Sequence, residues 1–282
     1  MNVKILIAYH KESLLIKDDV FCPIQVGRAV SNTKLDMIGD NTGENISEKN
    51  PIYCEMSAVY WAWKNLDADY IGLCHYRRIF TFYKNSYMIR VGRKIKYYLS
   101  KLVNIVKPGS IYLYTGLIKV YKRQDYITIS ENFSSNLVSI LQNTRYDAIL
   151  PRPIKLSTIN VYHFFEVGLE HMLLLDQIIK ENHPQFYYYY KKSLRSNTLY
   201  AANIFIMKKH IFDDYCKTIF SILEEHEKRT IDSGWCIDII KEKCYSRRSG
   251  YFAEILTNAY VTKLIDEGTE ILYANTAFLI DK

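Results

Sequence analysis

The sequence of 282 residues lacks a long apolar run. No stretch of about 20 apolar residues is free of charged side chains, which argues against a segment that spans a bilayer. The first ten residues hold a short apolar run without a small-residue cleavage site, and charged residues follow at once. We therefore expect residues 1–10 to form a first strand and not a secretory signal, and the protein to be cytoplasmic.

Paired cysteines and glycine-rich nucleotide motifs are also missing. The chain has six cysteines but no C-x-x-C pair, and it contains neither G-x-G-x-x-G nor G-x-x-x-x-G-K-[ST]. Close ligand pairs for a zinc site are therefore missing, and neither a dinucleotide fold nor a P-loop is supported. In a cytoplasmic protein the cysteines are expected to stay reduced. Hydrophobic residues make up 49% of the chain, which is enough for the core of a single domain spanning residues 1–282.

One segment has no acidic residue and carries the whole positive excess of the chain. Residues 84–123 contain ten Lys and Arg and no Asp or Glu, so the net charge of +7 becomes −3 when they are left out. Apolar and aromatic residues recur between Tyr97 and Val106 at helix-like intervals. A basic amphipathic insertion of this kind favours the surface of an anionic membrane. A solvated helix packed on the main domain is the alternative, and nucleic acid is disfavoured because no nucleic-acid motif accompanies the charge.

Strands and helices alternate along the chain. Apolar runs predict buried strands at 5–9, 70–74, 146–150, 200–207 and 271–275. A period of 3.6 residues predicts helices at 53–64, 162–180, 212–229 and 250–264. Asn50 and Pro51 have the residue types of an N-cap and a first helical position. We expect an α/β fold with a mixed, mostly parallel sheet flanked by helices, with 84–123 as a basic insertion.

The strongest candidate for chemistry is the run His75-Tyr76-Arg77-Arg78, which follows the predicted strand 70–74. Ligands of α/β sheets gather at strand ends. Arginine binds phosphate through a planar fork and keeps its charge. Two adjacent arginines at a strand end therefore suit a diphosphate leaving group, whose developing charge needs stabilisation. A structural arginine–carboxylate network is the alternative.

Three other segments supply further candidates. The Gly- and Asn-rich loop 39–50 offers backbone amides to a nucleotide or a sugar. Asp67-Ala68-Asp69 has the D-x-D pattern with which many nucleotide-sugar transferases hold a metal, but it precedes a strand, so we expect a solvated turn. Glu254, in the first turn of a predicted helix, suits a base that takes a proton from an attacking hydroxyl. A glutamate that only stabilises the helix start is the alternative, and Asp232 is the second candidate base.

Together these segments resemble a bacterial family long catalogued as a domain of unknown function. Its members occur in capsule, exopolysaccharide and O-antigen gene clusters and include galactofuranosyltransferases. The matching stretches are 5–11, 24–29, 39–65, 70–78, 203–209 and 250–254. They cover nearly the whole chain apart from the basic insertion, and the block 39–78 is long and specific. The family usually has Glu-Arg-Leu where this sequence has Glu254-Ile255-Leu256.

The resemblance implies an inverting glycosyltransferase with a GT-A-like domain, a UDP-galactofuranose donor and a lipid-linked glycan acceptor. With the basic insertion, it implies a peripheral location on the inner face of the cell membrane. The residues inferred to bind the nucleotide-sugar are His10, Lys11, Asp40, Asn41, Asn45, His75, Arg77, Arg78 and Asn203. Glu254 is the inferred base, and no metal or other cofactor is required. Two alternatives stay open: a metal-dependent hexosyltransferase that uses Asp67 and Asp69, and a non-catalytic membrane-associated scaffold.

Overall fold

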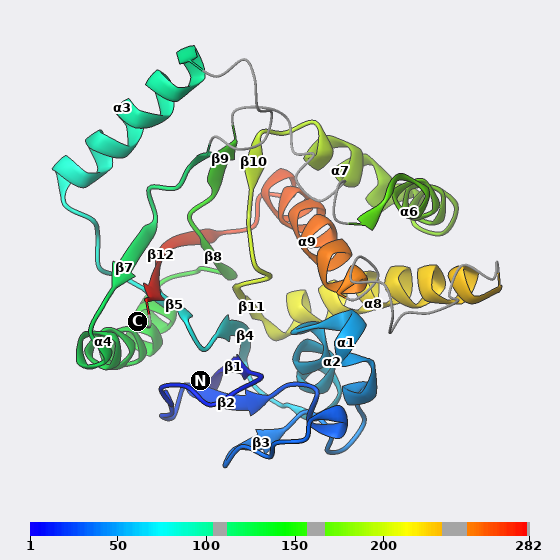
Figure 1. Ribbon diagram of the computed structural model, residues 1–282, viewed down its shortest axis with the longest axis horizontal. Coiled ribbons are helices and arrows are strands. Elements are labelled where there is room, and N and C mark those ends of the chain that lie inside the picture. Colours follow the sequence, from blue (N-terminus) through cyan, green and yellow to red (C-terminus); the bar gives the residue numbers. More distant parts are fainter. Residues whose placement is uncertain (104–111, 157–166, 233–246, 281–282) are drawn as a thin grey trace.

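A computed structural model describes residues 1–103, 112–156, 167–232 and 247–280 of the chain. Its centre is a nine-stranded sheet of order β11-β8-β12-β5-β4-β1-β2-β3, with β7 paired to β12 (Figure 1). Its strands are β1 (Val3–Tyr9), β2 (Phe21–Gln25), β3 (Ile38–Gly39), β4 (Tyr70–His75), β5 (Arg78–Thr81), β7 (Leu117–Val120), β8 (Ala148–Pro151), β11 (Phe205–Lys208) and β12 (Ile271–Leu279). A smaller sheet contains β10 (Thr198–Leu199), β9 (Ile154–Leu156) and β6 (Tyr112–Leu113).

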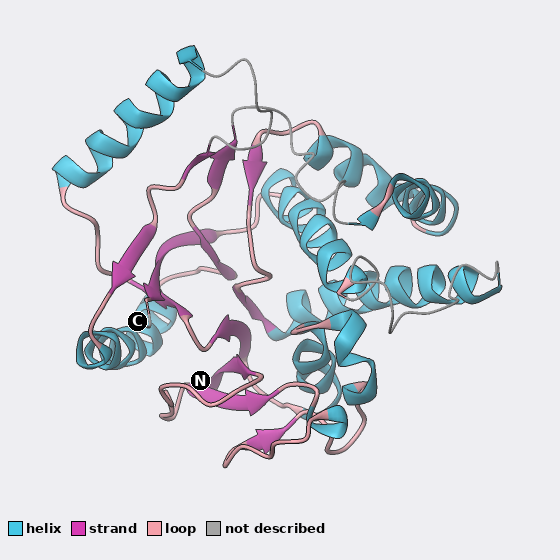
Figure 2. Ribbon diagram, in the orientation of Figure 1, coloured by secondary structure: helices cyan, strands magenta, loops and turns pink. Residues whose placement is uncertain are grey.

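Helices flank the sheet on two sides (Figure 2). They are α1 (Asn50–Tyr53), α2 (Met56–Asn65), α3 (Tyr87–Val103), α4 (Arg123–Asn143), α6 (Leu169–Asn182), α7 (Pro184–Leu194), α8 (Lys209–Asp232) and α9 (Arg248–Asp266). One core joins the sheet to α2 and α6–α9, and a second joins its other face to α4. Side chains of β4 alternate between them: Ile71 and Leu73 enter the first core, Tyr70 and Cys74 the second. The α/β fold with flanking helices is therefore confirmed.

The sheet is mixed, as expected, but it is not mostly parallel. The large sheet has five parallel pairings and four antiparallel ones among the described strands. The small sheet adds two antiparallel pairings, so antiparallel contacts outnumber parallel ones overall. The main source of the difference is β11, which runs antiparallel to β4 and β8. Apolar runs of this length predict burial and not direction, so the sequence pattern carried no information on this point.

Several predicted elements are confirmed with shifted ends, including β1, β4, β12, α8 and α9. The helix predicted over 53–64 is interrupted. Cys54 has φ 52° and ψ −133°, which ends α1 and lets α2 start separately at Met56. The N-cap assignment of Asn50 is wrong, because Asn50 is the first residue of α1 and Lys49 precedes it as the cap. The predicted helix 162–180 is observed as α6 from Leu169, and its residues 162–166 lie outside the described ranges.

The basic segment 84–123 contains α3, β6 and β7 within the described residues. Strand β7 pairs in parallel with β12, from Leu117 opposite Thr276 to Val120 opposite Leu279. The segment therefore adds a strand to the main sheet as well as carrying the basic helix α3. Among the described helices, none combines the length and apolarity needed to cross a bilayer.

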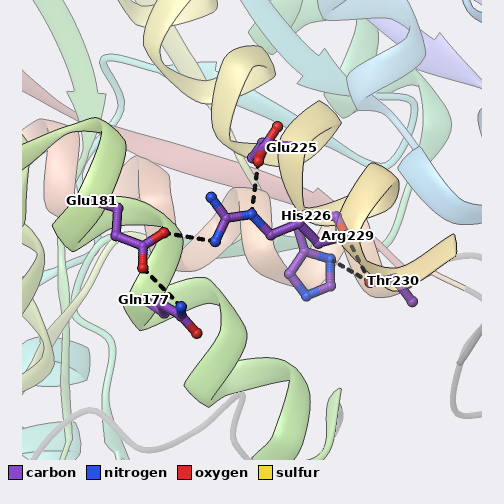
Figure 3. A network of polar contacts seen from close by, with 6 residues as sticks. All are labelled: Gln177, Glu181, Glu225, His226, Arg229 and Thr230. Atoms are coloured by element: carbon purple, nitrogen blue, oxygen red, sulfur yellow. Dashed lines mark hydrogen bonds and ion pairs between the residues drawn. The ribbon is translucent and has the colours of Figure 1, made fainter. Parts of the chain in front are cut away.

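A polar clamp joins α8 to α6 (Figure 3). Arg229 donates from Nε to Glu225 and from Nη1 to Glu181 of α6, both at 2.7 Å. The neighbouring His226 is buried, and its ring lies 4.6 Å from that of Phe252 on α9. Burial lowers the pKa of His226 to about 3, so this histidine is neutral at the junction of α8 and α9. These contacts thus hold α6, α8 and α9 to one another.

Candidate functional site

Two neighbouring cavities open where β1 and β4 end. Ala8 and His75 face each other in the parallel β1–β4 ladder, so the segments that leave the two strands emerge side by side. The first cavity, named here the histidine cavity, has a volume of about 380 Å³. Its lining residues are Ala8, His10, Val26, Asn50, Pro51, Cys54, Glu55, His75, Tyr76 and Arg247. The carboxyl ends of parallel strands are where α/β sheets bind ligands.

His10 lies on the wall of the histidine cavity directly after β1. Its ring stands edge-on to that of Tyr76, with 5.3 Å between the ring centroids. Desolvation lowers the pKa of His10, and the charges of Lys11, Arg247 and His75 lower it further. Lys11 is exposed at the rim, with Nζ 5.9 Å from the Tyr76 ring. Cations at Lys11 and Arg247 and the carboxylate of Glu55 therefore bring charges of both signs to this cavity.

Arg247 gives the histidine cavity a permanent positive charge. Its backbone N–H donates to the carbonyl of Pro51 at 2.9 Å, and its guanidinium lies 5.7 Å from the ring of Tyr251. Burial raises the pKa of the Cys54 thiol to about 11, so the thiol is protonated at neutral pH and is no nucleophile. Gly250 lets α9 approach this residue closely, because a Cβ there would lie 3.0 Å from Cys54 Sγ. These contacts fix the guanidinium at the cavity wall.

Backbone strain is concentrated at the same place. In the described part of the chain, four residues other than glycine have positive φ: Cys54 (52°), Ala202 (71°), Asn203 (48°) and Arg247 (74°). Cys54 and Arg247 line the histidine cavity, and Ala202 lines the cavity beside it. Such conformations cost about 1–3 kcal/mol each and persist only where the surroundings impose them. Their clustering is a sign of a functional site.

A chain of hydrogen bonds orients the carboxylate of Glu55 in the histidine cavity. Asn203, which is fully buried, donates from Nδ2 to Glu55 Oε1 at 2.9 Å and accepts from the hydroxyl of Thr257 at 3.0 Å. Asn203 was expected from the sequence to bind the nucleotide-sugar. With no exposed surface, it is instead a positioning residue for Glu55. No residue pattern singled out Glu55, because its segment looks like any acidic position near a helix start.

The second cavity, named here the Glu254 cavity, has a volume of about 510 Å³. Its lining residues are Arg78, Tyr114, Leu117, Lys119, Ile154, Leu156, Leu199, Ala201, Ala202, Tyr251, Glu254, Phe278 and Ile280. Two contacts separate it from the histidine cavity. His75 Nε2 donates to the carbonyl of Ala202 at 2.7 Å, and the Arg247 guanidinium lies 5.7 Å from the ring of Tyr251. The two cavities are therefore immediate neighbours.

Glu254 and Arg78 bring opposite charges into the Glu254 cavity. Glu254 comes from the second turn of α9. The guanidinium of Arg78 lies 5.3 Å from the ring of Phe278, and its buried Nε has no hydrogen-bond partner among the described residues. An unsatisfied buried donor costs about 1–3 kcal/mol. Arg78 therefore lines the cavity as a cation whose Nε is shielded from solvent.

The sequence predicted that the run His75-Tyr76-Arg77-Arg78 would form one cluster. In the structure its side chains face different cavities. A two-residue turn joins β4 to β5, and His75 pairs with Arg78 across it. His75 faces the histidine cavity, whereas Arg78 faces the Glu254 cavity. Arg77, at the turn, donates from Nε to the carbonyl of Leu279 at 3.0 Å and lies 5.0 Å from the ring of Phe278. Both guanidinium groups lie against the Phe278 ring, but only Arg78 lines the Glu254 cavity, and neither arginine lines the histidine cavity.

Asp40 holds the Gly- and Asn-rich loop instead of lining a cavity. The side chain is fully buried, and its carboxylate accepts hydrogen bonds from the N–H groups of Gly27 and Arg28. It also accepts from the hydroxyls of Ser47 and Ser57, the latter at 2.6 Å. All these partners are protein groups, so Asp40 shapes the segment that leads to α1 and α2. The expected direct contact with a nucleotide is not supported by this placement.

The remaining candidates also lie outside the two cavities. Asn41 is exposed, and Asn45 bonds within its own loop, to Gly43 and to the N–H of Ser47. Asp232 is the exposed last residue of α8. Asp69 accepts from the N–H of Asn2 at 2.6 Å, at the amino end of β4. Since β4 has six residues, Asp69 is roughly 20 Å from the cavities at the other end.

Comparisons with known proteins show which family the chain resembles. The model of the family described as "Domain of unknown function (DUF4422)" matches residues 4–265. A solved structure described as the apo structure of WbbM, a bifunctional glycosyltransferase, superposes with a TM-score of 0.76 and 27% sequence identity. The match covers 100% of this chain and 46% of that chain, so this chain spans about half of its length. No curated protein sequence matches the chain.

Proposed function

We propose that this chain, which belongs to the family described as a domain of unknown function (DUF4422), is a glycosyltransferase of polysaccharide synthesis. Its similarity to the glycosyltransferase WbbM supports this reaction class. One observation carries the proposal. A cavity lined by the permanent cation Arg247 and by the imidazoles of His10 and His75 adjoins a cavity lined by the carboxylate of Glu254, at the carboxyl ends of two parallel strands. The first suits a diphosphate and the second suits a hydroxyl that must lose a proton.

The proposed donor is a UDP-sugar held in the histidine cavity. His10 and Arg247 offer donors to the diphosphate, and Lys11 adds charge at the rim. This assignment replaces the expected pair Arg77 and Arg78, because neither arginine lines the histidine cavity. Galactofuranose as the transferred sugar, and a GT-A-like domain to bind it, rest on the family resemblance of residues 39–78.

The proposed reaction is a direct displacement with inversion. An acceptor hydroxyl in the Glu254 cavity attacks the anomeric carbon of the donor and forms the new glycosidic bond. The bond from that carbon to the β-phosphate oxygen breaks, and its electron pair leaves with UDP toward Arg247. The hydroxyl proton passes to the carboxylate of Glu254. Stabilising the charge on the leaving group with fixed donors lowers the barrier of such a step.

The proposed acceptor is a lipid-linked glycan at the cytoplasmic face of the membrane. Its sugar end would enter the Glu254 cavity, whose aromatic residues Tyr114 and Tyr251 suit the apolar faces of sugar rings. Arg78 and Lys119 line the same cavity and suit acceptor oxygens. The proposal requires no metal, since Arg247 supplies the charge. The alternative of a metal-dependent hexosyltransferase would place the metal on Asp67 and Asp69. These residues lie at the end of β4 that is far from the two cavities.

A transfer assay tests the proposal. The purified chain is incubated with UDP-galactofuranose or one of several UDP-hexopyranoses and a lipid-linked acceptor, with and without excess chelator. We expect one inverted glycosidic product, from UDP-galactofuranose, with an unchanged rate in chelator. Transfer of a hexopyranose instead would overturn the galactofuranose assignment, and loss of activity in chelator would favour the metal-dependent rival. If the chain neither binds nor turns over any of the UDP-sugars, the alternative of a non-catalytic scaffold would be favoured.

A further inference from the structure

The basic helix α3 is attached to the domain through its polar side. Arg93 donates from Nη1 to the carbonyls of Tyr114 (3.0 Å) and Leu117 (2.7 Å). Tyr97, one turn later, is 6% exposed and donates from its hydroxyl to the carbonyl of Leu156 at 2.9 Å. Residues four apart share one side of a helix, so these two side chains define the face that meets the domain.

The apolar face of α3 points away from the domain. At 100° per residue, Met88, Ile95 and Leu99 fall on the side opposite Arg93 and Tyr97. They are 75%, 54% and 56% exposed. Tyr87 and Tyr98, at one border of this face, are 71% and 61% exposed. Figure 1 shows α3 at the edge of the molecule, clear of the other helices. A helix in a globular protein normally buries such a face, so this one is built to meet something else.

Basic residues frame the exposed apolar face. Lys94 falls at the border next to Tyr87 and Tyr98, and Lys96 falls at the opposite border. Both are exposed, as are Arg90 and Lys101 on the same helix. The sequence from residue 84 to 123 contains no acidic residue. An apolar face bordered by lysines complements an anionic bilayer, where the apolar side chains enter the acyl boundary and the lysine ends reach the phosphates.

The anchoring contacts connect α3 to the Glu254 cavity. All three carbonyls that receive hydrogen bonds from Arg93 and Tyr97 belong to residues that line this cavity, namely Tyr114, Leu117 and Leu156. The helix is therefore fastened to the wall of the cavity that holds Glu254. A membrane bound to the outer face of α3 would lie beside the proposed acceptor site.

We propose that α3 docks on the surface of an anionic membrane and so presents the Glu254 cavity to membrane-bound acceptors. The docking itself follows from the exposed face of α3, whereas its role with the acceptor rests on the proposed function. A nucleic-acid backbone would complement the lysines but would leave Met88, Ile95 and Leu99 in water.

Sedimentation with vesicles tests the docking. The full chain is mixed with phosphatidylcholine vesicles, with or without 30% phosphatidylglycerol, in about 50 or 500 mM NaCl. We expect at least tenfold tighter binding to the anionic vesicles and at least a tenfold loss at high salt, because counterions screen the lysines. The double variants Ile95→Ser/Leu99→Ser and Lys94→Glu/Lys96→Glu should each lose tenfold or more. The matched charge control Lys180→Glu/Lys228→Glu, on exposed sites of α6 and α8, should stay within twofold.

Several results would overturn the docking proposal. Vesicles could bind the α3 variants as tightly as the wild type, or the wild type could fail to bind vesicles at all. The chain could also dimerise through α3 without binding vesicles, or bind duplex DNA with an affinity that Ile95→Ser/Leu99→Ser does not change. Circular dichroism of each variant checks that the fold is retained.

A second assay separates docking from catalysis. The Ile95→Ser/Leu99→Ser variant should transfer sugar normally to a short water-soluble acceptor but at least fivefold more slowly to a lipid-linked acceptor in anionic vesicles. Equal loss with both acceptors would contradict the docking role. Vesicle binding by a wild-type chain that transfers no sugar would instead overturn the proposed function and leave the docking intact.

Discussion

Helices α3 and α9 have similar lengths and make opposite use of their apolar residues. Of the 19 residues of α9, most apolar ones are buried, and Phe252, Ala253 and Leu256 are fully so. In α3, with 17 residues, Met88 and Leu99 are more than half exposed. Helix α9 brings Glu254 to a cavity, whereas α3 turns its apolar side outward beside the same cavity. Amphipathicity thus shows that a helix has an apolar side, but the anchoring contacts decide which medium that side meets.

The largest expected effect is the loss of the base on α9. Glu254→Gln keeps the shape of the side chain but cannot accept a proton, so kcat should fall by about 10²–10⁴-fold. UDP affinity should remain within twofold, since the histidine cavity is unchanged. The matched control Glu267→Gln, at the exposed C-terminal end of α9, should keep full turnover. Full turnover by Glu254→Gln with an intact fold would disprove the base assignment.

The two apolar faces should differ sharply in their contribution to stability. Phe252→Ala removes a fully buried ring and should lower the free energy of unfolding by about 3–5 kcal/mol. Leu99→Ala removes a side chain that is 56% exposed and should change it by no more than about 0.5 kcal/mol. Urea titration followed by circular dichroism measures both. A large destabilisation by Leu99→Ala would mean that the apolar face of α3 is covered within the protein.

Removing a cation from the histidine cavity should weaken UDP binding, whereas removing a cation from α3 should not. Arg247→Ala removes the permanent charge of the histidine cavity and should weaken UDP binding by about 10–100-fold, as expected for a hydrogen bond to a charged group. Lys94→Ala on α3 should leave UDP binding within twofold. Calorimetric titration with UDP gives both constants. If the two variants bind UDP equally, Arg247 is not at the diphosphate.

The last comparison concerns acid stability around α9. Burial lowers the pKa of His226 to about 3 and of His171 to about 4, while both titrate near 6.5 in the unfolded chain. Between pH 6.5 and about 4 the unfolded chain therefore binds more protons, so the free energy of unfolding falls as the pH falls. His226→Gln should flatten this dependence in melting curves recorded from pH 7 to 4. An unchanged slope would show that His226 is not buried as a neutral ring.

Much of the framework was predictable from the sequence, but the site was predictable only in part. Apolar runs located β1 and β4, and chain order placed His10 and His75 at strand ends, where the structure brings them together. Arg77 and Arg78 lie outside the cavity that His75 lines because of a tight turn after His75, which residue types alone do not specify. Arg247 and Glu55 were missed because their placement depends on left-handed backbone at Cys54 and Arg247, and residues other than glycine carry no sequence signal for it.

The position of a bound nucleotide tests the central claim most directly. A crystal structure of the chain with UDP should show the diphosphate in the histidine cavity, with its oxygens within about 2.6–3.2 Å of donors on Arg247 and on His10. A diphosphate bound outside that cavity, away from Arg247, would contradict the account.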